Sequence, residues 1–265
     1  MDATIQGCRI FYRRSQVEKS DGPTILLLHG WGCDGSIFSF IERGLNERAD
    51  VLTVDFPGHG QSGEPPQPWG VPEYAGQIAG LLESLSIPKV RIVAHSFGGR
   101  VAVYLASHRP ELVEQMVITG GAGIRKPLTD TQKKRQARFK RINAFFNALK
   151  RFFPLSAIVG RWQEALRRRY GSADYIRLNE NMRQTFSKVV SQDLYPFLKD
   201  IQAPTLLVWG SEDTETPLWM GEQMEKAIPD AGLVVFEGRT HFAFIEEWQR
   251  FLTIAKQFFW GGQTA

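Results

Sequence analysis

The sharpest chemical signal in the sequence is a serine between small residues, in the run Val93-Ala94-His95-Ser96-Phe97-Gly98-Gly99. An apolar strand pattern ends at Ser96 and a helix pattern starts directly after it, which predicts a sharp corner that holds the hydroxyl above a sheet. Small residues two positions away let the two backbones approach, and Gly98 and Ala94 meet that need. Helix N–H groups at such a corner face developing negative charge. The run therefore predicts a nucleophilic serine for acyl transfer.

A serine hydroxyl is a weak nucleophile, so it needs a base that a third group holds in position. The chain offers five histidines for that role: His29, His59, His95, His108 and His241. Four of them have plainer interpretations. Two lie in glycine turns, one adjoins Ser96, and His108 ends a helix pattern, where an imidazolium is favoured by the helix dipole. His241 follows the last strand pattern and precedes the final helix.

Alternating strand and helix patterns must position these groups. Short apolar runs predict strands at residues 8–12, 25–28, 51–54, 90–94, 116–119, 205–209 and 233–236. The runs at 25–28 and 51–54 are continuously apolar, as in strands buried on both faces of a parallel sheet. Helix patterns cover residues 72–85, 98–108 and 244–259. This order predicts an α/β fold with a mostly parallel, doubly wound sheet.

A basic, strand-free stretch interrupts that alternation. Residues 125–190 hold 17 Lys and Arg against 4 Asp and Glu, whereas the rest of the chain holds 15 against 24. Helix patterns occupy residues 131–150 and 155–169, and a third helix runs from a cap at Ser172 or Asp174 through Val190. We expect a helical cap inserted into the core, with core segments 1–123 and 197–265 around a cap at 124–196.

Several motifs in order resemble the α/β-hydrolase superfamily. The Ser96 corner is one, although Ala94 replaces the usual glycine. His29-Gly30-Trp31-Gly32 is similar to the family's oxyanion loop, and the run from Asp55 to Ser62 is similar to its D-x-P-G-x-G-x-S turn. The cap falls where this family inserts one. The small bacterial carboxylesterases of the pimeloyl-carrier-protein methyl esterase type carry the most similar loop and cap.

The resemblance implies a role for each site residue. Ser96 would attack an acyl carbonyl, His241 would act as the base, and Asp213 would orient the imidazole. Glu212 and Glu215 remain alternatives to Asp213. The resemblance also implies an oxyanion hole from the backbone N–H groups of two residues and a supporting loop around it: Trp31 and Phe97 for the hole, and His29, Gly30 and Gly98 for the support. We expect ester hydrolysis through an acyl-enzyme.

Other functions share this set of residues. C–C hydrolases, enol-lactonases, thioesterases and perhydrolases carry the same triad, and some members of the fold are ligand sensors without catalysis. Eight basic and no acidic residues lie between Thr131 and Phe153. They are either a solvated face or a surface for an acidic partner, namely an acyl carrier protein, a coenzyme A ester or an anionic membrane. Nucleic acid is not expected, because no reading motif is present.

Composition excludes several classes. No run reaches 18 apolar residues, which argues against a membrane-spanning helix. Cys8 and Cys33 are too few for a disulfide framework or a zinc site, and no spacing indicates a metal, nucleotide or flavin. The N-terminal residues lack a basic region followed by an apolar run, so we expect no secretory signal and a cytoplasmic location.

Overall fold

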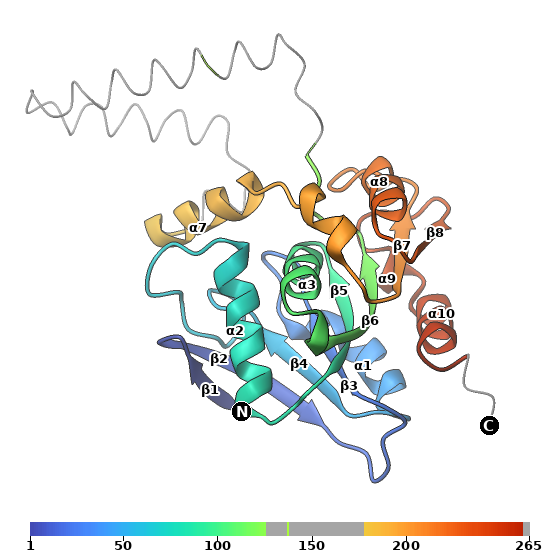
Figure 1. Cartoon of the computed structure of the whole chain (residues 1–265), viewed down its shortest axis with the longest axis horizontal. Helices are drawn as coiled ribbons and strands as arrows, with labels where there is room; N and C mark the ends of the chain where they lie inside the picture. The colour runs from blue at the N-terminus through green and yellow to red at the C-terminus, as the bar shows by residue number, and fades with distance from the viewer. Residues whose placement is uncertain (126–136, 138–177, 262–265) are drawn as a thin grey trace, which may run out of the picture. The chain divides into compact units, whose positions relative to one another are not determined.

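Eight strands form one sheet in the order β1-β2-β4-β3-β5-β6-β7-β8 (Figure 1) in the computed structural model, which describes residues 1–125, 137 and 178–261. The elements in chain order are β1 (Asp2–Ile5), β2 (Cys8–Ser15), β3 (Thr24–Leu28), η1 (Gly35–Phe38), α1 (Ser39–Leu45), β4 (Val51–Asp55), α2 (Val71–Ser84), β5 (Val90–His95), α3 (Phe97–His108), η2 (Pro110–Leu112), β6 (Val113–Thr119), α7 (Glu180–Ser191), η3 (Tyr195–Asp200), β7 (Thr205–Gly210), α8 (Trp219–Ala227), β8 (Ala231–Phe236), α9 (Ala243–Glu246) and α10 (Trp248–Trp260).

The sheet is parallel from β4 to β8 and antiparallel at its other edge. Strands β4, β3, β5, β6, β7 and β8 pair in parallel, while β1 with β2 and β2 with β4 pair antiparallel. The central strands are apolar on both faces, and residues 25–28 of β3 are wholly buried. The predicted α/β fold with a mostly parallel sheet is confirmed, and all seven predicted strands are present.

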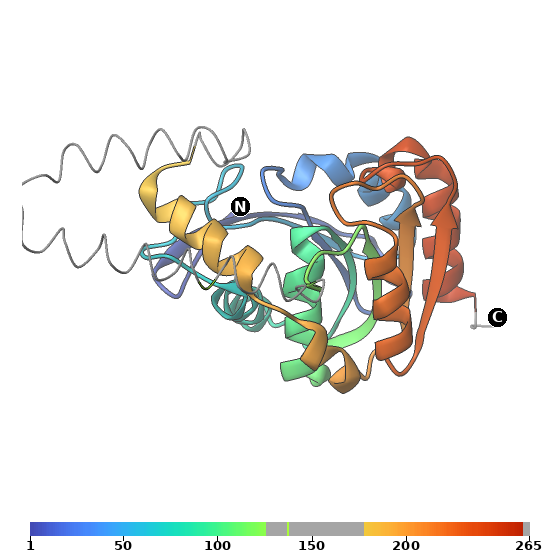
Figure 2. The same cartoon turned by 90° about the horizontal axis from the view of Figure 1, so that it is seen from above.

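Helices cover both faces of the sheet (Figure 2). One apolar cluster joins the sheet to α2, α3 and α8, with Tyr74, Val101 and Met224 among its buried members. A second joins the opposite face to α1 and α10, with Ile41 and Phe251 among its members. These two apolar clusters, one on each face, hold the sheet in place. The candidate site lies at the carboxyl ends of its parallel strands.

Some elements differ from the sequence predictions. The single helix predicted at 244–259 is wrong, because the structure divides it into α9 and α10 at Glu247, whose φ of −127° and ψ of 50° leave the helical region. The carboxylate of Glu247 accepts hydrogen bonds from Arg239 and Arg250. Strand β1 and helices α1 and α8 were not predicted.

By its internal contacts the chain divides into two compact units, Met1–Ile124 with Glu180–Ala265, and Arg125–Asn179. Helix α7 belongs to the first unit, whereas the sequence boundaries place it in the cap. The predicted cap helices at 131–150 and 155–169, and the start of the third, lie outside the described residues. In the described part of the chain, no helix is both long and apolar enough to cross a membrane.

Candidate active site

Ser96 occupies the corner between β5 and α3, as predicted. Its φ of 50° and ψ of −107° lie where non-glycine residues are rare and strained. The backbone holds this conformation, because the Ser96 N–H donates to Thr119 O at 3.1 Å and Ser96 O accepts from Gly99 and Ala122. From Val90 to Gly99 every residue is buried except Ser96, which is partly exposed. The corner therefore exposes a hydroxyl at the carboxyl end of the central strands.

Two glycines make room for this corner. A Cβ at Gly98 would lie 2.1 Å from the backbone oxygen of Leu28, so no side chain fits where α3 meets β3. A Cβ at Gly30 would lie 3.0 Å from the His95 ring and 3.4 Å from the Ser96 Cβ. The loop after β3 therefore passes directly beside the serine, and neither Gly30 nor Gly98 leaves ordinary space for a side chain.

Asp213 and His241 meet through a side-chain hydrogen bond. Nδ1 of His241 lies 2.8 Å from Oδ2 of Asp213, whose side chain is fully buried. The other carboxylate oxygen accepts the backbone N–H groups of Glu215 and Thr216. Burial raises the pKa of Asp213, but hydrogen bonds from His241 and Thr216 outweigh it and hold the pKa below its usual value. Asp213 is thus a buried carboxylate that is hydrogen-bonded to the imidazole of His241.

The two acidic neighbours of Asp213 are excluded as partners of His241. Glu212 and Glu215 are exposed, and neither side chain is hydrogen-bonded to His241. Of the three carboxylates that the sequence left open, only Asp213 bonds to this histidine in the structure.

Tight contacts between loops bring His241 to this place. A Cβ at Gly210 would lie 2.2 Å from the Arg239 backbone oxygen, so the absence of a side chain lets the loop before His241 approach β7. A Cβ at Gly120, whose φ is +53°, would lie 3.0 Å from His241 Nδ1. The side chains of Thr240 and Glu246 also bond to each other across this loop. His241 is therefore held against Gly120, directly after β6. The preceding residue, Thr119, is the one whose backbone oxygen accepts the Ser96 N–H.

Three other histidines are buried and neutral. His29 Nδ1–H donates to Gly30 O at 2.7 Å, and its Nε2 accepts from the Phe56 N–H at 2.9 Å. Burial lowers the pKa of His29 to about 4 and that of His95 to about 3. Burial likewise lowers the pKa of His59 to about 4. Because both ring nitrogens of His29 are hydrogen-bonded to backbone groups, this histidine fits a supporting role and not that of a base.

His95 ends β5 directly before Ser96, and its ring packs against that of the candidate base. Its ring centroid is 4.6 Å from that of His241, and its Nδ1–H donates to Thr119 O at 3.1 Å. The ring also contacts Phe242 and Phe244. The residue that directly precedes Ser96 therefore packs against the ring of His241.

The predicted oxyanion residues lie together. The rings of Trp31 and Phe97 are 5.3 Å apart and nearly perpendicular. Phe97 begins α3, so its N–H belongs to the first helical turn, where amide groups have no intrahelical acceptor. The Trp31 ring also contacts Phe186 of α7, which is partly exposed. The contact between Phe186 and the loop after β3 was not predicted from the sequence.

Sequence reasoning missed Thr216. It lies three residues after Asp213 and is 5% exposed, and its hydroxyl reaches both Asp213 and His241. A threonine three residues after an aspartate can complete a turn around that carboxylate, but this spacing alone does not distinguish Thr216 from other loop residues.

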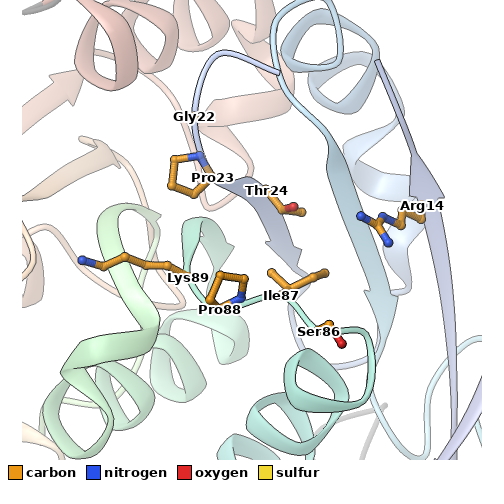
Figure 3. Close-up of a pocket in the computed structure, with 8 residues that line it drawn as sticks. All are labelled: Arg14, Gly22, Pro23, Thr24, Ser86, Ile87, Pro88 and Lys89. Carbon is orange, nitrogen blue, oxygen red and sulfur yellow. The ribbon is translucent and has the colours of Figure 1, made fainter. Parts of the chain in front are cut away.

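A separate cavity of about 270 Å³ lies near the amino ends of the central strands β3 and β5, away from the carboxyl ends that carry Ser96 (Figure 3). Its lining includes Arg14, Thr24 and Ser86, and the Lys89 side chain extends away from Arg14. It is distinct from the Ser96 corner, which lies at the other end of β5. Among the described residues, no group of three or more His, Cys, Asp and Glu side chains could hold a metal ion.

Comparison with known proteins identifies the fold family. A family model described as alpha/beta hydrolase fold matches residues 23–247. The pimeloyl-(acyl-carrier protein) methyl ester esterase of Chromobacterium violaceum is 27% identical over 239 residues, which cover 87% of this chain and 92% of the esterase.

Solved structures agree with this match. A bacterial membrane phospholipase A superimposes with a TM-score of 0.75 at 26% identity, covering 100% of this chain and 86% of its own. The enol-lactonase of Burkholderia xenovorans LB400 gives a TM-score of 0.73 at 23% identity, covering 98% of this chain and 99% of its own, and at that identity it bears on the fold alone.

Proposed function

The chain belongs to the α/β-hydrolase fold family, and on this premise we propose that it is a serine hydrolase that cleaves carboxylic esters through an acyl-enzyme. The observation that carries the proposal is the buried Asp213–His241 hydrogen bond beside a strained, partly exposed serine. The similarity to a methyl ester esterase supports the ester as the bond.

The proposed reaction begins with the hydroxyl of Ser96. Its Oγ attacks the ester carbonyl while Nε2 of His241 takes the hydroxyl proton. Asp213 accepts the Nδ1–H, which keeps the Nε2 lone pair available, and its charge stabilises the imidazolium that forms. The C–O bond then breaks, and the imidazolium gives its proton to the leaving alkoxide. An acyl group remains on Ser96.

Water completes the cycle by the same route. His241 takes a proton from water, the hydroxide attacks the acyl carbon, and Ser96 leaves with the proton returned by His241. In both halves the backbone N–H groups of Trp31 and Phe97 stabilise the oxyanion. Each such donor typically contributes about 3–4 kcal/mol of transition-state stabilisation. No step requires a group beyond this chain, the ester and water.

A substrate panel tests the proposal. Purified protein and its Ser96→Ala variant are assayed on p-nitrophenyl esters of increasing acyl length, thioesters, lactones and vinylogous C–C substrates. We expect multiple turnovers on esters that the variant loses. Turnover of only thioesters, lactones or C–C substrates would contradict the ester as the bond cleaved and would leave Ser96 as the nucleophile. Equal rates in both proteins, or no turnover on any substrate, would contradict catalysis by Ser96.

A further inference from the structure

The hydroxyl of Thr216 lies where the acid, the base and the end of β6 meet. Its Oγ1 is 2.8 Å from Oδ2 of Asp213, 3.2 Å from Nδ1 of His241 and 3.0 Å from the backbone oxygen of Gly120. The backbone of Thr216 is fixed independently, because its N–H donates to Asp213 Oδ1 at 2.8 Å and its oxygen accepts from the Trp209 indole at 2.6 Å. The hydroxyl is therefore held at this junction by a rigid loop.

Counting protons limits what this hydroxyl can do. It has one proton and two lone pairs, and a carboxylate and a backbone carbonyl can only accept. When its proton goes to Gly120 O, a lone pair is free to face the Nδ1–H of His241. When its proton goes to Asp213 Oδ2, it braces the carboxylate that accepts from the same Nδ1–H. Both arrangements fit the tautomer with a proton on Nδ1, which leaves Nε2 as the base.

We propose that Thr216 is a positioning residue that fixes the His241 ring and acts as a second acceptor for its Nδ1–H when the imidazolium forms. This inference rests on the proposed function, in which His241 is the base. Turning its proton to Gly120 O lets the hydroxyl present a lone pair at the moment that the ring becomes charged. Hydrogen bonds to charged groups are stronger than neutral ones, so this contact favours the transition state over the resting enzyme.

The burial of the site strengthens this effect. The Asp213 side chain is fully buried and that of His241 is 12% exposed, so water cannot easily replace the hydroxyl. Gly120 has no side chain, and a Cβ there would crowd His241 Nδ1 at 3.0 Å. The end of β6 can therefore supply its carbonyl to Thr216 while leaving space for the imidazole.

The test compares Thr216→Val, Thr216→Ser and Thr214→Val. Valine matches threonine in shape and lacks the hydroxyl, and serine restores it. Thr214 lies on the same loop but is exposed, so Thr214→Val is a matched control. We expect Thr216→Val to lower kcat about tenfold while KM changes less than about twofold. Thr216→Ser and Thr214→Val should remain within about twofold of the unsubstituted protein in both constants.

The pH profile gives a readout that a purely structural role would not move. Loss of an acceptor for the charged ring should shift the acid limb of kcat/KM in Thr216→Val to lower pH by about half a unit to one unit. Thermal unfolding identifies any variant that fails to fold. In that event, the Thr216→Ser and Thr216→Ala pair carries the comparison, and only the serine variant should keep the limb of the unsubstituted protein.

An NMR titration of the His241 imidazole in the Ser96→Ala background separates this inference from the proposed function, because it needs no turnover. A lower midpoint on adding Thr216→Val supports the inference even if no ester is cleaved. An unchanged midpoint, or an unchanged kcat and acid limb in an active enzyme, would overturn it.

Discussion

Asp55 and Asp213 both lie buried at the carboxyl side of parallel strands, and each has a histidine nearby, His59 for Asp55 and His241 for Asp213. Asp55 ends β4, and its two carboxylate oxygens accept the backbone N–H groups of Gly35 and Gln61. The neighbouring His29 likewise uses both ring nitrogens on backbone groups. In this region both carboxylate oxygens of Asp55 and both ring nitrogens of His29 are hydrogen-bonded to backbone groups.

The Asp213 region uses the same residue types differently. One carboxylate oxygen binds the loop backbone, and the other binds the side chains of Thr216 and His241. Only Nδ1 of His241 has a hydrogen-bond partner within residues 1–125 and 178–261, and its side chain is partly exposed. A histidine becomes available for proton transfer when one nitrogen is oriented and the other is left unused. His29 and His241 differ in this respect and not in residue type.

Exchanging each aspartate for asparagine should separate the two regions most strongly. Asp213→Asn should lower kcat about 10⁴-fold with little loss of stability, because an amide favours the wrong imidazole tautomer. Asp55→Asn should leave kcat within about threefold and lower the free energy of unfolding by about 1–3 kcal/mol, because one backbone N–H loses its acceptor. Ester turnover and urea unfolding measure both. The reverse pattern would mean that the roles are exchanged.

The neutral state of His29 predicts a pH dependence of stability. Its pKa is about 4 in the fold, against 6.5 for an unperturbed histidine, so the unfolded chain binds more protons between these values. Stability should therefore fall as the pH drops from 7 to 5, with about 2 kcal/mol due to His29. Asp213 does not contribute in this window, because its lowered pKa protects its stabilisation until the pH falls below about 4.

Urea unfolding of His29→Gln at pH 7 and pH 5 measures that contribution. The loss of stability between the two pH values should be about 2 kcal/mol smaller than in the unsubstituted protein. His108→Gln is the matched control, since His108 is exposed. Identical losses in His29→Gln and the unsubstituted protein would show that His29 does not stay neutral in the fold.

Strain at Ser96 predicts a smaller effect in the opposite direction. Ser96→Gly removes the Cβ from a backbone with φ of 50°, so stability should rise by about 1 kcal/mol and Tm by about 2–4 °C. Ser96→Ala keeps the Cβ and should show no such gain. Differential scanning calorimetry distinguishes the two. A gain in both variants would assign the effect to the hydroxyl and not to the backbone.

The basic residues between Thr131 and Phe153, which lie outside the described residues, give the weakest expected effect. If this stretch binds an acidic partner, hydrolysis of an acyl-carrier-protein ester should slow a few-fold at high salt. Hydrolysis of a small neutral ester should be insensitive to the same change. Equal salt dependence for both substrates would leave the stretch as a solvated face.

The sequence predicted those elements whose burial or backbone geometry restricts the residue types of neighbouring positions. Burial on both faces requires continuous apolar residues, which revealed β3 as residues 25–28. The Ser96 corner requires small neighbours, which Gly98 supplies. Strand β1 was not predicted, because its residues alternate between exposed and partly buried and contain no apolar run. The break at Glu247 was not predicted; in the structure this residue bonds to Arg239, which lies eight residues earlier.

The site shows the same division. The resemblance to α/β-hydrolases placed His241 and favoured Asp213, but Glu212 and Glu215 remained possible until the loop geometry showed which carboxylate points inward. Thr216 could not be selected, because a loop threonine has no distinctive pattern and its importance depends on Gly120 and His241, which are distant in sequence. Local sequence patterns cannot predict contacts between residues that are far apart in the sequence.

Covalent labelling tests the central claim most directly. A fluorophosphonate is incubated with the unsubstituted protein, with His241→Ala and with Asp55→Asn, and the modified peptide is identified by mass spectrometry. We predict one adduct, on Ser96, that forms rapidly in the unsubstituted protein and in Asp55→Asn and is lost or greatly slowed in His241→Ala. Labelling at another residue, or equal labelling rates with and without the His241 imidazole, would contradict it.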